Sequence, residues 1–154
     1  MTSKTVIDAL EIWLRKHLPI YEHIGATVEQ VGEVTRCRLP LNNKNKNHFN
    51  AVHAALQFAV MELAGGVAGK RSPVISSEKH LLMVKSLKID FLKPALSAVE
   101  AVVHLSDSEL QKLEAVLLKD GRVEFDLDCD LIDESGEIVS KSVAVYYVRA
   151  RKPD

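Results

Sequence analysis

The apolar residues of this sequence repeat with a helical period in some segments and with a period of two in others, which predicts the order of its elements. Residues 5–17 have helical spacing, with Thr5 placed to cap the helix and Pro19 placed to prevent its continuation. After an Asn- and Lys-rich loop at residues 42–50, a second helix is expected over residues 52–70. Its core stripe is spaced by four, four, three and four positions and consists of Val52, Leu56, Val60, Leu63 and Val67.

Segments with a period of two lie on both sides of this long helix. Residues 26–39 are strand-like and are broken at Gly32, where a tight turn is expected. Four further strands are predicted after the helix, with a hairpin turn at residues 134–136, and they cover residues 81–91, 99–105, 123–131 and 139–148.

A short helix is also predicted between two of these strands. Ser106 and Glu109 form a capping box at its start, it runs through Leu117, and Gly121 is a natural stop. The complete order has one long helix, rich in small residues, among strands joined by short connections. This order predicts an α+β fold in which an antiparallel sheet wraps around the long helix.

Composition narrows the classes of function. The chain has 154 residues, of which 47% are hydrophobic and 27% charged, as in a globular protein of one domain. Its 20 Lys and Arg nearly balance its 21 Asp and Glu, so no basic face for nucleic acid is expected. Cys37 and Cys129 are too few for a disulfide framework, and both fall in strand patterns that predict burial. We expect a single cytoplasmic domain over residues 1–154.

Residues 51–69 contain no Lys or Arg and have the length of a membrane span. However, His53, Gln57 and Glu62 interrupt the segment, and its apolar residues are largely Ala and Val. The N-terminal residues also lack the apolar core of a signal peptide. We therefore interpret the segment as a buried helix and expect no membrane partner.

The same helix carries the candidate chemistry. His53 stands at its start, where the N–H groups of Ala54 and Ala55 would be unpaired and able to stabilise a developing oxyanion. Glu62 lies off the core stripe, on a side made of Ala and Gly rather than of other charged residues. A carboxylate in such surroundings would be partly desolvated, which raises its pKa and suits a general base.

His53 and Glu62 are nine residues apart, which is two and a half helical turns. The two side chains therefore point to opposite sides and are separated by roughly 13 Å along the axis. They cannot act on one carbonyl group within a single chain. A two-fold dimer could bring Glu62 of one subunit close to His53 and the Ala55 N–H of the other, so we expect a homo-oligomer, at least a dimer, with shared sites.

Residues 47–66 resemble the signature of hotdog-fold acyl-CoA thioesterases, in which Asn or Gln precedes a His-Gly-Gly and a later Asp or Glu. Asn47, His53 and Glu62 occupy the corresponding positions. Residues 87–95 also resemble the strand that follows the central helix in that family. The resemblance covers the whole chain, with the helix at about residues 5–17 as an addition, and is strongest to the phenylacetate-pathway and 4-hydroxybenzoyl-CoA branch.

This resemblance implies a hydrolase that cleaves an acyl thioester, with no cofactor beyond the coenzyme A that forms part of the substrate. Glu62 would activate water or attack the thioester, Asn47 would position the nucleophile or substrate, and His53 would lie near the carbonyl group. The backbone N–H of Ala55, with Ala54 adjacent, would polarise that carbonyl. The chain departs from the family in having Ala54 and Ala55 in place of two glycines, and Asn50 where Gly is usual. Asn is among the best substitutes where a glycine needs a positive φ.

Structural alternatives exist for each candidate residue. Glu62 could be a solvated acid or one paired with a Lys, His53 a helix cap, and Asn47 a plain turn residue. No His-x-x-x-His or Cys-x-x-Cys pair is present, so no metal site is predicted. Five cations could meet the phosphates of coenzyme A or could be ordinary surface charges: Lys70, Arg71, Lys85, Lys88 and Lys93.

Two other functions are compatible with the same fold. The first is a dimeric acyl-ligand binding protein without turnover. The second is a hydratase or dehydratase, because the pair His48-Phe49 is similar to the start of a dehydratase His-Phe-Pro motif. The prolines and the glycine that follow in that motif are absent here, which makes this alternative an analogy only.

Overall fold

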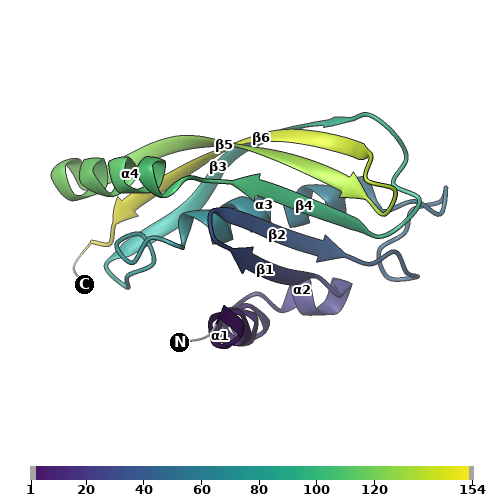
Figure 1. Ribbon diagram of the computed structural model, residues 1–154, viewed down its shortest axis with the longest axis horizontal. Coiled ribbons are helices and arrows are strands. Elements are labelled where there is room, and N and C mark those ends of the chain that lie inside the picture. Colours follow the sequence, from purple (N-terminus) through teal and green to yellow (C-terminus); the bar gives the residue numbers. More distant parts are fainter. Residues whose placement is uncertain (1–2, 153–154) are drawn as a thin grey trace.

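The computed structural model describes residues 3–152 and contains a six-stranded antiparallel sheet that curves around one central helix, α3 (Figure 1). The strand order across the sheet is β1-β2-β4-β5-β6-β3. This arrangement confirms the predicted α+β architecture. The elements in chain order are α1 (Ser3–His17), α2 (Pro19–Ile24), β1 (Thr27–Val31), β2 (Val34–Leu39), α3 (Ala54–Gly69), β3 (His80–Phe91), β4 (Val99–His104), α4 (Asp107–Asp120), β5 (Arg122–Asp133) and β6 (Ile138–Ala150).

The N-terminal segment forms two helices rather than one. α1 begins at Ser3, so Thr5 lies inside the helix, and the prediction that Thr5 caps it is wrong. Pro19 does end α1, but it also starts α2, because proline lacks an N–H and has a fixed φ that suits the first helical position. α2 ends at Gly25, whose φ of 78° is the left-handed conformation that glycine adopts easily. In Figure 1 both helices lie next to β1, beyond the edge of the sheet.

The buried core follows the predicted periodicities. Alternate residues of β5 from Val123 to Leu131 are buried against α3, while the acidic residues between them face outward. In the predicted stripe, Val60, Leu63 and Val67 of α3 are buried and Leu56 is half-buried. Val52 is also buried, but it lies two residues before the start of α3. The capping box of Ser106 is formed, and α4 continues to Asp120 before Gly121 ends it. Cys37 and Cys129 are free thiols in the core, which confirms their predicted burial.

β3 differs from its prediction because it is an edge strand. It pairs only with β6, and a bulge between Val84 and Ser86 shifts its register. The alternation predicted a half-buried strand with Met83 and Phe91 on its buried side, but these residues are 40% and 50% exposed. The sequence pattern does not distinguish an edge strand, one side of which has no neighbour, from a central one.

None of the helices in the described part of the chain is long and apolar enough to cross a membrane.

Candidate functional site

Glu62 lies on α3 at the wall of a cavity of about 260 Å³. The cavity is enclosed by α1, α2, α3 and β3, and most of its lining is apolar. The Tyr21 hydroxyl, which α2 brings to α3, donates a hydrogen bond of 2.8 Å to Oε2 of Glu62. Glu62 is thus a half-buried carboxylate held at one oxygen, beside a mainly apolar cavity.

Burial raises the pKa of Glu62 above its usual range, because the surrounding groups solvate the carboxylate less well than water does. The hydrogen bond from Tyr21 opposes this effect and lowers the pKa in part. Among the side chains of residues 9–152, no Lys, Arg or His lies within ion-pair distance of the Glu62 carboxylate. None of these residues therefore forms the Lys pair that was the alternative for Glu62.

Tyr146 of β6 fixes the backbone of α3 at the same point. Its hydroxyl donates a hydrogen bond of 2.6 Å to the carbonyl oxygen of Glu62. The Tyr146 ring can come this close to α3 only because residue 65 is glycine, since a Cβ there would lie 2.6 Å from Cζ of Tyr146. At Gly66, in contrast, an added Cβ would meet only Oε1 of Glu62, at 4.0 Å. Sequence reasoning identified this small-residue face but missed both tyrosines.

His53 is the N-cap of α3, and its Nδ1 accepts a hydrogen bond of 3.1 Å from the N–H of Ala55. The start of α3 is where the sequence predicted it, and the side chains of His53, Ala54 and Ala55 are exposed. The proposed oxyanion donor at Ala55 is thus engaged by the His53 ring. The N–H of Ala54 has no hydrogen-bond acceptor among the described residues, so it is the free donor at this helix start.

Asn47 organises the turn that leads into α3. Its Oδ1 accepts hydrogen bonds from the N–H groups of Phe49, at 2.9 Å, and Ala51, at 3.1 Å. This geometry is that of a turn residue. Asn50, in the same turn, has a φ of 58°, so it does adopt the conformation for which it was expected to replace glycine. Asn47 and Ala54 line a shared surface groove of about 340 Å³.

The predicted site residues therefore fall into two groups within one chain. Asn47 and Ala54 line the groove at the start of α3, whereas Glu62 lines the cavity beneath α1 and α2. The residues that line the two spaces do not overlap. A single protomer thus contains the two halves of the expected site in separate places.

Most of the candidate phosphate-binding cations are paired with carboxylates. Arg71 contacts Asp107, and Lys85, Lys88 and Lys93 have acidic partners within 3.3 Å. Lys70 instead lies over the ring of Trp13, with its Nζ 4.0 Å from the ring centroid, and it lines the cavity that contains Glu62. Among the side chains that the structure describes, residues 9–152, no three His, Cys, Asp or Glu are grouped to hold a metal ion.

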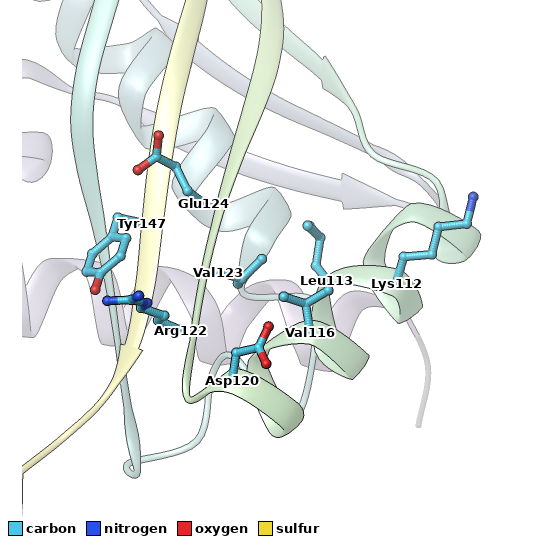
Figure 2. A pocket seen from close by; sticks show the side chains of 8 residues that line it. All are labelled: Lys112, Leu113, Val116, Asp120, Arg122, Val123, Glu124 and Tyr147. Carbon is cyan, nitrogen blue, oxygen red and sulfur yellow. The ribbon is translucent and has the colours of Figure 1, made fainter.

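A hollow of about 920 Å³ lies between α4 and the strands β5 and β6 (Figure 2). It is lined by exposed charged side chains, including Arg122 and Glu124, and the latter already pairs with Lys85 at 2.7 Å. None of the predicted site residues lines it. Its size does not make it the site, because its charged side chains are exposed and none of them is a desolvated group of the kind that marks an active site.

Comparison with solved structures identifies the fold. A protein of unknown function from Pseudomonas aeruginosa, described as a probable thioesterase, is 26% identical, with a TM-score of 0.82 over 94% of this chain and 96% of that one. A protein of unknown function from Chlorobaculum tepidum is 18% identical, with a TM-score of 0.82 over 97% and 98% of the two chains. A thioesterase from Haemophilus influenzae is 15% identical, with a TM-score of 0.71 over 97% and 92%.

These similarities establish the expected hotdog architecture, in which the sheet wraps around the central helix. No curated protein matches the sequence. One family model matches most of the chain, over residues 8–148. The chain has the fold of hotdog thioesterase structures, and it belongs to the family described as a domain of unknown function, DUF4442.

Proposed function

We propose that this protein hydrolyses an acyl thioester, with Glu62 as the catalytic carboxylate. The observation that carries the proposal is the Glu62 carboxylate itself. It is half-buried without a cationic partner among the described residues, lies beside an apolar cavity, and has a raised pKa. Titratable groups perturbed by desolvation in a pocket are typical of active sites. The likeness to structures named thioesterases agrees with this reaction.

In the proposed reaction, Glu62 removes a proton from water, and the resulting hydroxide forms a C–O bond to the thioester carbonyl carbon. The C–S bond then breaks, and the proton held by Glu62 passes to the leaving thiolate, so that a carboxylic acid and a thiol are formed. Tyr21 keeps one carboxylate oxygen fixed and leaves Oε1 to face the reacting water. Direct attack by Glu62, with later hydrolysis of an anhydride, uses the same geometry.

We propose that the helix start which completes each site comes from a second copy of the chain. Within the described residues, the outer edge of β3 has no neighbouring strand, and exposed apolar side chains lie along it and near the start of α3. Such an unpaired edge is a natural surface for pairing with another copy. These exposed residues are Phe49, Phe58, Met83, Val84, Phe91 and Leu92.

Asn47, His53, Ala54 and Ala55 of the partner would then lie close to the thioester carbonyl. The N–H of Ala54 would polarise this group, and the N–H of Ala55 would join it once the His53 ring moves away. The resemblance of residues 47–66 supports the phenylacetate-pathway and 4-hydroxybenzoyl-CoA branch. The two buried free cysteines agree with a cytoplasmic protein.

A binding protein without turnover is the second candidate, and one observation favours it. The His53 ring caps the Ala55 N–H, and in this state it blocks one of the two donors that hydrolysis would use. Such a protein would bind acyl ligands through the same cavity and would not cleave them.

The substitution Glu62→Gln separates the two candidates, since Gln keeps an oxygen to accept the Tyr21 hydrogen bond but cannot act as a base. Release of free thiol from a panel of straight-chain and aromatic acyl-CoA and acyl-pantetheine thioesters would be measured for both proteins. We expect the variant to lose at least about 100-fold in kcat/KM while its melting temperature does not fall. A wild-type protein that binds these thioesters without cleaving any of them would contradict hydrolysis and favour the binding protein.

A further inference from the structure

We propose that the cavity enclosed by α1, α2, α3 and β3 binds an unbranched aliphatic acyl chain, and that Trp13 of α1 limits the length of this chain. The inference rests on the proposed function for the identity of the ligand, an acyl thioester. The chain-binding site itself lies within one protomer.

The lining of the cavity matches an aliphatic chain. α1 contributes Leu10, Trp13 and Leu14, α3 contributes Leu63 and Val67, and β3 contributes Leu82. Two of the polar groups that line the cavity are engaged: the Tyr21 hydroxyl donates to Glu62, and the Tyr146 hydroxyl donates to the Glu62 carbonyl. The remaining donor, the Lys70 ammonium, lies over the Trp13 ring. Between Trp13 and Glu62, shape and apolar contact are therefore the main selective features.

The Glu62 carboxylate lies at one end of the cavity, and Trp13 and Lys70 form the rim at the other end. The Glu62 carboxylate marks where the carbonyl carbon must lie for hydrolysis, so the chain extends from Glu62 toward α1. Trp13, 38% exposed, stands at the rim with the Lys70 ammonium over its ring. The indole therefore closes the cavity on the side of α1, and its removal would open the space to solvent.

The volume of the cavity sets the expected length. We take about 30 Å³, the volume of one water molecule in the liquid, for each carbon of the chain. A cavity of 260 Å³ then holds a chain of roughly eight carbons. Each methylene that enters should tighten binding about fourfold, until the chain reaches Trp13. Longer chains should gain no further affinity.

The test measures binding of S-alkyl N-acetylcysteamine thioethers with 4 to 16 carbons by isothermal titration calorimetry. These probes are neutral and cannot be hydrolysed, and they carry the thiol end that coenzyme A shares with acyl-carrier proteins. For the wild type we expect affinity to rise to a maximum at about eight carbons. Trp13→Ala should move this maximum to longer chains. Gly66→Leu, at the position where an added side chain finds space beside Glu62, should move it to shorter chains.

Ile12→Ala is the matched control, because Ile12 is on the same helix but is 67% exposed and does not line the cavity. It should bind the series as the wild type does. An unchanged length dependence in both Trp13→Ala and Gly66→Leu, or no binding of any chain length by the wild type, would overturn the proposal. Binding is read without cleavage, so a Glu62→Gln variant that hydrolyses like the wild type would refute the proposed function and leave this result intact.

Discussion

The contact between Gly65 and Tyr146 gives the sharpest prediction, because it holds the central helix and the carboxylate in place together. The substitution Gly65→Ala puts a methyl group 2.6 Å from Cζ of Tyr146, so the ring or the helix must shift. Overpacking of this kind costs about 1–3 kcal/mol. Loss of the hydrogen bond from Tyr146 to the Glu62 carbonyl adds about 1 kcal/mol. The better helix propensity of Ala returns about 0.5–1 kcal/mol.

The net effect is a loss of about 2 kcal/mol in the free energy of unfolding, or a melting temperature lower by about 4–8 °C for a chain of this size. Thermal unfolding followed by circular dichroism, at one fixed protein concentration, measures this difference. Gly66→Ala is the matched control, since its methyl group meets only Oε1 of Glu62 at 4.0 Å. It should leave the melting temperature unchanged or raise it slightly. Equal melting temperatures for the two variants would refute the packing argument.

Two further predictions concern Glu62 and Tyr21, and a third concerns the turn before α3. Because burial raises the pKa of Glu62 above its value in the unfolded chain, the free energy of unfolding should fall as the pH rises above about 4.3. Glu62→Gln should therefore gain stability relative to the wild type between about pH 4 and 8, and a stability difference that does not vary with pH would contradict this. Tyr21→Phe removes the hydrogen bond that lowers the pKa of Glu62, so the acidic limb of the pH profile of kcat/KM should move to higher pH. A profile that keeps its position and only falls in height would show that Tyr21 has a structural role alone. Asn50→Ala, at a φ of 58°, should cost about 1 kcal/mol in a denaturant titration while Asn50→Gly costs little, and equal losses would count against backbone strain as the cause.

The sequence predicted those features that depend on local periodicity. The alternation in β5, the capping box of α4 and the start of α3 at His53 each have a signal within a few residues, and the structure contains all three. Glu62 stood out for a similar reason, as one acid on a helix face of Ala and Gly.

The features that the sequence did not reveal depend on contacts between distant segments. The hydrogen bonds of Glu62 come from Tyr21 and Tyr146, which are 41 and 84 residues away along the chain. Pro19 was interpreted only as the end of a helix, so the helix that carries Tyr21 was missed. The position of β3 at the edge of the sheet is set by strand order, which a period-two pattern does not encode.

A mixing experiment tests most directly whether Glu62 of one chain acts with the helix start of another. One chain carries Glu62→Gln, and the other carries Ala54→Trp, which fills the groove at the exposed start of α3. Each variant alone should be a folded dimer with little thioesterase activity. After the two are unfolded together and refolded, half of the dimers should be mixed and should contain one intact site of two, so about a quarter of the wild-type activity should return. A mixture no more active than the sum of the separate variants would contradict the shared site.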